Sequence, residues 1–355
     1  MKRYVRGGMI VLAVTALLLS GCAEKAEEGG QETAKKEVTK TIELKYNDFN
    51  ASGIGITNLT QEKLDKVEEL TDGRVKVTCY FNASLIKYPE TFQGVSSGVA
   101  DISYYMVGGT PGVHQLNEVF NLPFLGFKDI EQAADAYNTI LDDFPALQEE
   151  NEQYNLRWLA LHPMLPFHLH MTNDVFRTPE EMKGQKVLAE GHNAHLFNEI
   201  GAVAMNMGPA DWYTSLQRGV VDGHFTHFVV PMEFKTDELL KYHTVFGEGG
   251  GGNGCCGYLI NLDSWNKLTP EDQKILTDVF QEINSEVVQL DIGLEEKALA
   301  KLEEEGGHTI VELGPEEIGL WQEAAQPTIE RWIENTEEKG LPGREIYEAM
   351  TELAE

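Results

Sequence analysis

The sequence predicts an α/β protein built of two interleaved lobes and one long helix that spans both. Strand and helix patterns alternate from Thr41 to Val107, and a second alternation covers residues 178–223. A third observation is a helical pattern of roughly 35 residues that begins after Thr269. About 310 residues follow the N-terminal segment, which exceeds the usual size of a single domain. Two lobes are therefore expected.

The first lobe is predicted from an alternation that favours a parallel, doubly wound sheet. Its elements are a strand at 41–46, a helix at 59–70, a strand at 75–81, a helix at 88–97 and a strand at 101–107. In the first helix, Leu64, Val67 and Leu70 share one face. A helix at about 129–150 and strands at 155–161 and 167–171 then lead towards the second lobe.

The second lobe is predicted from a compact β-α-β-α-β unit. Thr178-Pro-Glu-Glu-Met-Lys-Gly-Gln-Lys indicates a turn, a short helix and a strand. Met207 to Gly223 indicates a strand end, a helix from Pro209 to about Arg218 that begins with proline, and a glycine turn into another strand. In open α/β sheets, ligands bind at strand ends and helix starts, so this unit is expected to form the site.

The long helix has a strong start, with Thr269 as N-cap and Pro270 in the first turn. Apolar residues recur at helical spacing through Val287 and, more weakly, past Leu302. A helix of this length spans roughly 50 Å, enough to lie across both lobes. Two helices broken near Gly293 are the alternative. Residues 318–353 are also predicted to be helical and acidic.

The N-terminus resembles a bacterial lipoprotein signal. Lys2, Arg3 and Arg6 precede an apolar stretch, Met9 to Leu19, of about half the length of a bilayer-spanning helix. Leu19-Ser-Gly-Cys22 resembles the lipobox, in which the cysteine is lipidated, so Cys22 is the predicted lipid attachment site. An ordinary secretory signal is the alternative. Residues 23–40 contain little to bury and are expected to form a flexible tether.

The charge balance excludes nucleic acid as a partner. The chain has 28 basic and 58 acidic residues and a formal net charge of −30. Removing residues 1–21 also removes three basic residues, which leaves 25 − 58 = −33. Such a chain repels nucleic acid and anionic membranes, and an anionic ligand would need local compensation.

The chain from about Thr41 to Leu353 resembles the solute-binding subunits of TRAP (tripartite ATP-independent periplasmic) transporters. The resemblance rests on motifs in a specific order: Leu70-Thr-Asp-Gly-Arg-Val-Lys-Val77, Gly98-x-x-Asp101, Leu122-Pro-Phe124, the unit at 178–223, Tyr242-His-Thr244 and Asn261-x-x-x-Trp265-x-x-Leu268. It implies a type II periplasmic-binding-protein-like fold, and an extracytoplasmic receptor without catalytic activity or a cofactor. The implied partners are a small organic solute and integral membrane permease subunits driven by an ion gradient.

The predicted organisation combines the signal, the tether and the two lobes. The ranges are a lipoprotein signal peptide at 1–21, a tether at 22–40, lobe I at 41–165 and 254–290, lobe II at 166–253 and 291–325, and a C-terminal helical segment at 326–355. The expected location is extracytoplasmic, with the lipid anchor holding the protein at a membrane.

The expected binding site departs from the family at its most characteristic residue. The family usually binds a ligand carboxylate with an arginine in the Lys-hydrophobic-Arg strand, whereas this chain has Lys186-Val-Leu188. A second frequent arginine corresponds to His168, and Arg177 is a weaker substitute. The predicted binding residues are Asn50, Tyr105, His168, Leu188, Glu190, His192, Pro209, Trp212, Thr226 and His227. The solute is therefore expected not to be a simple dicarboxylate. Core packing of the following helix is the alternative role for Trp212.

Histidine is dense between residues 162 and 227, where seven of the ten histidines occur: His162, His168, His170, His192, His195, His224 and His227. A hydrogen-bonding pocket is one interpretation, and a metal-binding or metal-bridged site beside Glu190 is the alternative function. The pairs are too separated to define a zinc motif, so no metal ligand is assigned. Histidines scattered without a common role are equally compatible.

Two further motifs carry weaker hypotheses. Cys79 is expected to be a small buried hydrophobe, whereas Cys255-Cys256 lies in a glycine-rich run and allows a metal, redox or close-packing role. Gly94-Val-Ser96-Ser-Gly98 matches the hydrolase nucleophile pattern. That elbow needs a strand before the serine and a helix after it, and the predicted order here is the reverse.

Overall fold

The computed structural model of the protein describes residues 41–110 and 112–354. The predicted signal peptide, the tether and Cys22 lie outside the described residues. Within the described ranges, no helix combines the length and the apolar composition that crossing a bilayer requires.

In the described chain, the first sheet has five strands in the order β2-β1-β3-β10-β4. They are β1 (Ile42–Asn47), β2 (Val75–Tyr80), β3 (Ile102–Met106), β4 (Leu156–Pro163) and β10 (Cys255–Asn261). β1 is parallel to β2 and β3, as predicted, but β10 is antiparallel to both β3 and β4. The parallel arrangement predicted for the strands between residues 41 and 107 is therefore confirmed, and β10 makes the complete sheet mixed. β10 enters from the second sheet through a loop and not through a helical crossover.

The helices around the first sheet divide three of the predicted helices into shorter pieces. They are α1 (Gly55–Asp65), α2 (Val67–Leu70), η1 (Tyr88–Glu90), α3 (Thr91–Ser96), η2 (Asn117–Asn121), α4 (Ile130–Asp143), α5 (Pro145–Glu152) and α9 (Leu262–Trp265). The helix expected at 59–70 begins at Gly55 and is interrupted at Lys66. The one expected at 129–150 is interrupted at Phe144, because Pro145 has no backbone N–H to continue the hydrogen bonding.

The second sheet has six strands among the described residues, in the order β11-β9-β5-β8-β6-β7. They are β5 (His168–Met171), β6 (Lys186–Leu188), β7 (Val203–Met205), β8 (Gly223–Thr226), β9 (Tyr242–Val245) and β11 (Thr309–Glu312). The short helices between them are η3 (Pro179–Met182), α6 (Gly191–Glu199), α7 (Pro209–Gln217), α8 (Val229–Glu233) and η4 (Thr236–Glu238). β6 is parallel to β7 and β8, so the predicted β-α-β-α-β unit is confirmed.

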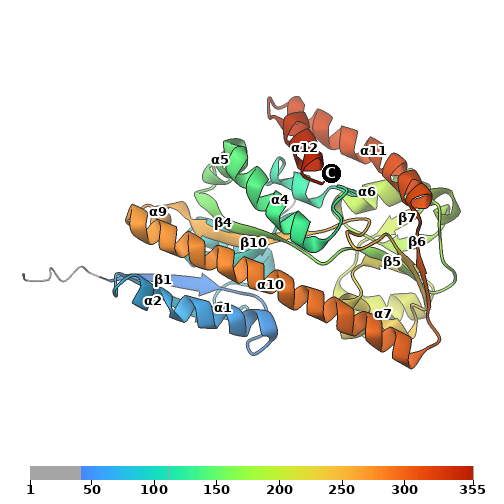
Figure 1. Ribbon diagram of the computed structural model, residues 1–355, viewed down its shortest axis with the longest axis horizontal. Coiled ribbons are helices and arrows are strands. Elements are labelled where there is room, and N and C mark those ends of the chain that lie inside the picture. Colours follow the sequence, from blue (N-terminus) through green and yellow to red (C-terminus); the bar gives the residue numbers. More distant parts are fainter. Residues whose placement is uncertain (1–40, 111, 355) are drawn as a thin grey trace, which may run out of the picture. The chain divides into compact units, whose positions relative to one another are not determined.

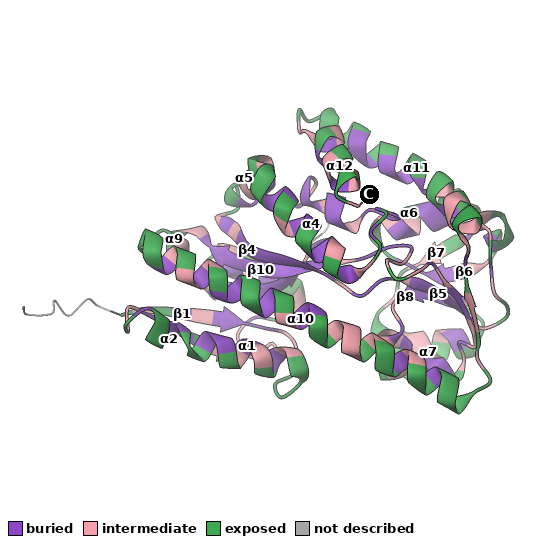
Figure 2. Cartoon of the chain, in the orientation of Figure 1, coloured by how far each residue is buried: buried purple, intermediate pink, exposed green. Residues whose placement is uncertain are grey.

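A single helix, α10 (Pro270–Glu305), runs for 36 residues and packs against elements of both sheets (Figure 1). The Thr269 side chain caps it by accepting a hydrogen bond from the backbone N–H of Asp272. Gly293 lies inside the continuous helix, so the alternative of two helices was wrong. Figure 2 shows buried residues recurring along the half of α10 beside the first sheet. Phe280 packs in the core of that sheet, and Leu302 packs beside Phe228.

The chain passes between the two sheets repeatedly, since β4 leads to β5, β9 leads to β10, and α10 leads to β11. After β11, α11 (Pro315–Glu337) packs against α6, and α12 (Gly343–Glu352) packs against α4 (Figure 1). The two sheets form two interleaved lobes joined by α10. The residue boundaries of the lobes stay predictions.

Candidate functional site

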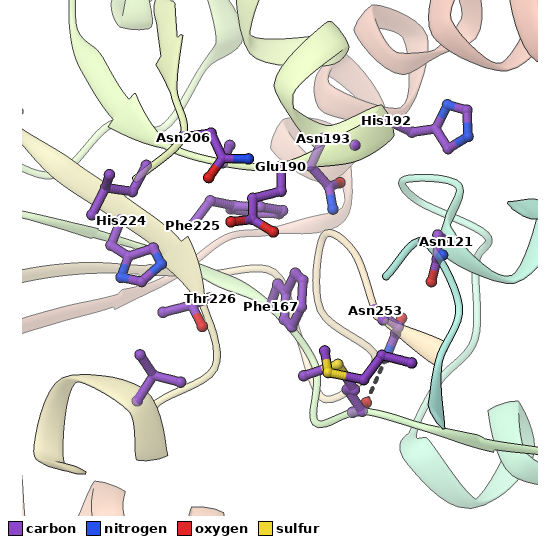
Figure 3. Close-up of a pocket in the computed structure, with 18 of the residues that line it drawn as sticks. Asn121, Phe167, Glu190, His192, Asn193, Asn206, His224, Phe225, Thr226 and Asn253 are labelled. Atoms are coloured by element: carbon purple, nitrogen blue, oxygen red, sulfur yellow. Dashed lines mark hydrogen bonds between the residues drawn. The ribbon is translucent and has the colours of Figure 1, made fainter. Parts of the chain in front are cut away.

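A cavity of about 470 Å³ lies where loops and strand ends of the two sheets meet (Figure 3). The second sheet contributes Leu188 at the end of β6, Glu190 just before α6, Asn206 directly after β7, and Thr226 at the end of β8. Because β6, β7 and β8 run in parallel, their carboxyl ends meet at one edge of the sheet. The local β-α-β-α-β pattern thus places these four residues in one wall.

The opposite wall comes from the first sheet and its connections. Tyr88 lies in η1, Met106 ends β3, Asn121 ends η2, and Cys255 begins β10. The Asn121 side chain accepts a hydrogen bond from the Cys255 backbone N–H at 2.8 Å and donates one to the Val107 carbonyl at 3.1 Å. This asparagine therefore holds three segments of the wall together.

The ionisable side chains of the cavity lining are glutamates and histidines, besides a tyrosine and a cysteine. The lining, within the described residues, contains no lysine and no arginine. The His192 Nε2 atom lies 3.1 Å from a Glu118 carboxylate oxygen, so this carboxylate has a partner. Burial lowers the pKa of His224 to about 3 and that of His227 to about 4, so both rings are neutral at physiological pH.

Six of the ten binding residues predicted from the sequence line the cavity, and four do not. The six are Leu188, Glu190, His192, Trp212, Thr226 and His227; the four outside are Asn50, Tyr105, His168 and Pro209.

Each residue outside the cavity has a local explanation. His168 is buried in β5, and its Nδ1 atom accepts a hydrogen bond from the Phe246 backbone N–H at 3.3 Å. Tyr105 is buried against other aromatic rings of the first lobe. Asn50 lies in the loop after β1, where its carbonyl accepts a hydrogen bond from Asn82, and Pro209 is exposed at the start of α7.

Leu188 and Trp212 belong both to the cavity and to the packing behind it. Leu188 is buried and packs with Leu216, Val221 and Leu240. The Trp212 indole N–H donates to the Met207 carbonyl at 2.8 Å, and its ring packs edge-on against His224. Trp212 therefore packs against the core, as its alternative role requires, and also lines the cavity; its part in ligand binding stays a prediction. Arg177 is not in the lining and pairs with Glu317 at 2.8 Å.

The histidines do not gather into a metal site. Within the described residues, no group of three or more histidine, cysteine, aspartate or glutamate side chains is arranged to hold a metal ion. His192, His195, His224 and His227 line the cavity, whereas His162, His168 and His170 are buried elsewhere. No observation favours the metal-bridged alternative, and it is not carried further.

The cysteine and serine motifs have structural surroundings that explain them. Cys255 and Cys256 are buried free thiols, and burial raises the pKa of the Cys256 thiol to about 12. Their glycine-rich run is closely packed, since a side chain at Gly249 would overlap the Phe127 backbone. Ser96 ends α3, and its hydroxyl donates to the Tyr154 carbonyl at 2.6 Å, so the strand-serine-helix elbow of a hydrolase is not formed.

Several cavity residues were missed by reading the sequence. They are Tyr88, Phe167, Asn193, Asn206, Phe225 and Asn253. Asn206 directly follows β7, and Asn193 lies in the first turn of α6, so the rule of strand ends and helix starts identifies both positions. Phe167 and Asn253 come from the connections between the sheets, which have no comparable local signal.

Comparison with known proteins gives one consistent family. Residues 33–335 match the family model described as bacterial extracellular solute-binding protein, family 7. A solute-binding protein of Verminephrobacter eiseniae is 26% identical over 251 residues, which cover 69% of this chain and 71% of the relative. The C4-dicarboxylate-binding periplasmic protein DctP of Rhodobacter capsulatus is 26% identical over 273 residues, covering 75% and 79%.

A solved structure supports the same fold. The TRAP periplasmic solute-binding protein of Desulfovibrio salexigens superposes with a TM-score of 0.77 at 25% sequence identity, covering 89% of this chain and 96% of that one. The predicted two-lobe, type II-like fold is thereby confirmed. The chain belongs to bacterial extracellular solute-binding protein family 7, and it is a TRAP solute-binding subunit, an extracytoplasmic receptor and not an enzyme.

Proposed function

We propose that the protein captures a small organic solute in the cavity between its sheets and delivers it to integral membrane TRAP permease subunits. The observation that carries the proposal is the cavity itself, whose walls come from two sheets joined by the continuous helix α10. A site divided between two lobes is closed by their relative movement around the ligand. Such closure distinguishes the loaded receptor from the empty one.

The preferred solute is not a simple dicarboxylate. Leu188 stands where the family usually has its carboxylate-binding arginine, and the described lining contains no lysine or arginine to replace it. An arginine binds a carboxylate through two charge-assisted hydrogen bonds, each worth roughly 1.5–3 kcal/mol. Polar contacts in this cavity are instead available from amides, neutral imidazoles and the Thr226 hydroxyl.

Calorimetry with succinate tests this part of the proposal. The unmodified protein is expected to bind succinate weakly, whereas Leu188→Arg is expected to gain affinity. Leu188→Gln is the matched control, because it adds polarity without charge at the same position. Circular dichroism verifies that both variants fold, since Leu188 also packs in the core. Micromolar binding of succinate by the unmodified protein would contradict the proposal.

The receptor is further proposed to be held at the membrane by a lipid on Cys22, with residues 23–40 as the tether. The support is the sequence Leu19-Ser-Gly-Cys22. Replacing Cys22 with serine is expected to abolish lipidation and cleavage, which changes the mass of the mature protein. If the variant had the same mature mass as the unmodified protein, the proposal would be contradicted.

A further inference from the structure

Glu190 is an unpaired carboxylate that lines the cavity and is exposed to solvent. It immediately precedes α6, and its side chain extends among Asn193, Asn206 and Phe225 (Figure 3). No described side chain or backbone group donates a hydrogen bond to its carboxylate, and no lysine or arginine lines the cavity with it. The side chain stays exposed, but the surrounding protein removes part of its hydration and thereby raises the pKa of the Glu190 carboxyl.

A purely structural role does not account for this carboxylate. Acidic residues are common at helix starts, where they interact favourably with the helix dipole or cap the first N–H groups. The Glu190 side chain makes no such capping hydrogen bond. Glu118 shows the contrast within the same cavity, because its carboxylate lies 3.1 Å from His192 Nε2. The protein supplies His192 as a partner for the Glu118 carboxylate, whereas the Glu190 carboxylate is available to the solute.

A second acceptor points to the same kind of ligand. Asn193 is only 6% exposed and lines the cavity, and its carbonyl oxygen Oδ1 is buried without a hydrogen-bond donor. A buried acceptor without a partner costs free energy, and a rotation of the Asn193 amide, whose Oδ1 has almost no accessible surface, would bring this oxygen to a ligand N–H in the cavity. The rings of Phe167 and Phe225 lie beside them, packed edge-to-face with centroids 5.8 Å apart. Aromatic faces also attract cations.

We infer that the solute carries a positively charged nitrogen whose N–H groups are donated to Glu190 and Asn193. This inference rests on the proposed receptor function and names the chemical class of its solute: an organic amine that is cationic or zwitterionic. A zwitterion places its carboxylate away from Glu190, where neutral amide and imidazole N–H groups replace the missing arginine. An ammonium group beside Glu190 forms the charge-assisted bond that the protein itself does not supply.

Matched pairs of probes that differ at one group test the inference. The pairs are 4-aminobutyrate with succinate, phenylglycine with mandelate, and benzylamine with benzyl alcohol. Calorimetry measures each dissociation constant for the unmodified protein, Glu190→Gln and Glu248→Gln. Glu248 is exposed and outside the cavity lining, so its substitution changes the net charge equally without touching the site.

The expected result is binding of at least one amine probe, tighter than its amine-free partner. In Glu190→Gln the affinity for that amine falls about tenfold or more, because a hydrogen bond between charged groups is lost. The change in Glu248→Gln stays within about twofold, as for exposed charges generally. Asn193→Asp, checked for folding, is expected to tighten amine binding by adding a second carboxylate.

Three outcomes would overturn the inference. They are an amine-free probe that binds better than its amine partner, an amine affinity unaffected by Glu190→Gln, and no amine probe binding at millimolar concentration. In the first two outcomes a solute still occupies the cavity, so the receptor function survives. In the third, a thermal-shift screen across acids, alcohols and amides decides the receptor function separately, because any tight ligand raises the melting temperature.

Discussion

The Nδ1 atoms of the buried residues His170 and His243 lie 2.8 Å apart and form the centre of a hydrogen-bonded chain. His243 Nε2 lies 2.9 Å from His308 Nδ1, and His308 Nε2 lies 3.0 Å from the Lys241 ammonium. At the other end, His170 Nε2 lies 3.0 Å from the Thr226 carbonyl. An ammonium only donates and a carbonyl only accepts, so the direction of every bond is determined, and each imidazole is neutral with one tautomer.

Acid is expected to destabilise the protein through this chain. Burial lowers the pKa of His243 to about 3 and that of His170 well below its usual value. As the pH falls below about 6.5, the unfolded chain binds protons that the folded state does not, so the free energy of unfolding decreases. Urea denaturation at neutral and mildly acidic pH measures this loss.

A variant isolates the contribution of the chain. His243→Asn is expected to be less stable at neutral pH by about 1 kcal/mol or more, but to lose less stability on acidification. His195→Gln, on the exposed side of α6, is expected to keep most of the original pH dependence. If the stability of His243→Asn depended on pH just as that of the unmodified protein does, the acid-induced loss could not be attributed to this chain. The ionisable groups near the chain are His168, His224, Asp237, Lys241 and Glu305.

The ionised carboxylate of Asp291 is expected to destabilise the folded protein at alkaline pH. Burial in α10 raises its pKa to about 7, so the folded state holds a proton that the unfolded carboxyl has already lost. The free energy of unfolding begins to decrease as the pH rises above the pKa of the Asp291 carboxyl in the unfolded chain. The decrease is complete once the pH exceeds about 7. Asp291→Asn should therefore raise the melting temperature at pH of about 8 by a few degrees, with a smaller gain near pH of about 4. Glu296→Gln, exposed on the same helix, is the control, and an equal gain in it would contradict the prediction.

Gly249 is expected to tolerate no side chain. A Cβ atom there would overlap the backbone carbonyl of Phe127, which cannot move like a flexible side chain. Gly249→Ala is therefore expected to cost about 2 kcal/mol or more, the upper range for overpacking. Gly208→Ala is the matched control, because a Cβ atom there meets nothing within 4 Å. Equal denaturation midpoints for the two variants would refute the close packing.

Ligand binding is expected to close the two lobes around the cavity. The lobe ranges predicted from the sequence, 41–165 with 254–290 against 166–253, would approach one another while α10 bends. Small-angle scattering with and without a verified ligand should show a smaller radius of gyration in the complex. Superimposable profiles would count against closure.

Local patterns predicted most elements, and tertiary contacts decided the rest. Thr269 and Pro270 were sufficient to locate the start of α10, because capping is a local interaction. The antiparallel direction of β10 could not be inferred, since it depends on where a distant strand enters the sheet. Pro145 offered a signal for the break between α4 and α5 that the predicted continuous helix did not use.

The site shows the same division. The rule of strand ends and helix starts brought Glu190, His192 and Thr226 to the cavity. It could not exclude His168, because strand periodicity identifies a face and not the neighbour that covers it. The spacing of His168 and His170 in the sequence likewise gave no indication of His243, which reaches the chain only because β9 pairs with β5.

The unbroken course of α10 also fixes an angular relation between the lobes. Successive residues of an α-helix are rotated by roughly 100°, as 3.6 residues per turn require. Deleting one residue near Gly293 would turn every later side chain by that angle, so Ala298 and Leu302 would leave the core around Phe228. Relatives are therefore expected to vary in length in their loops, whereas the number of residues in α10 is expected to stay constant.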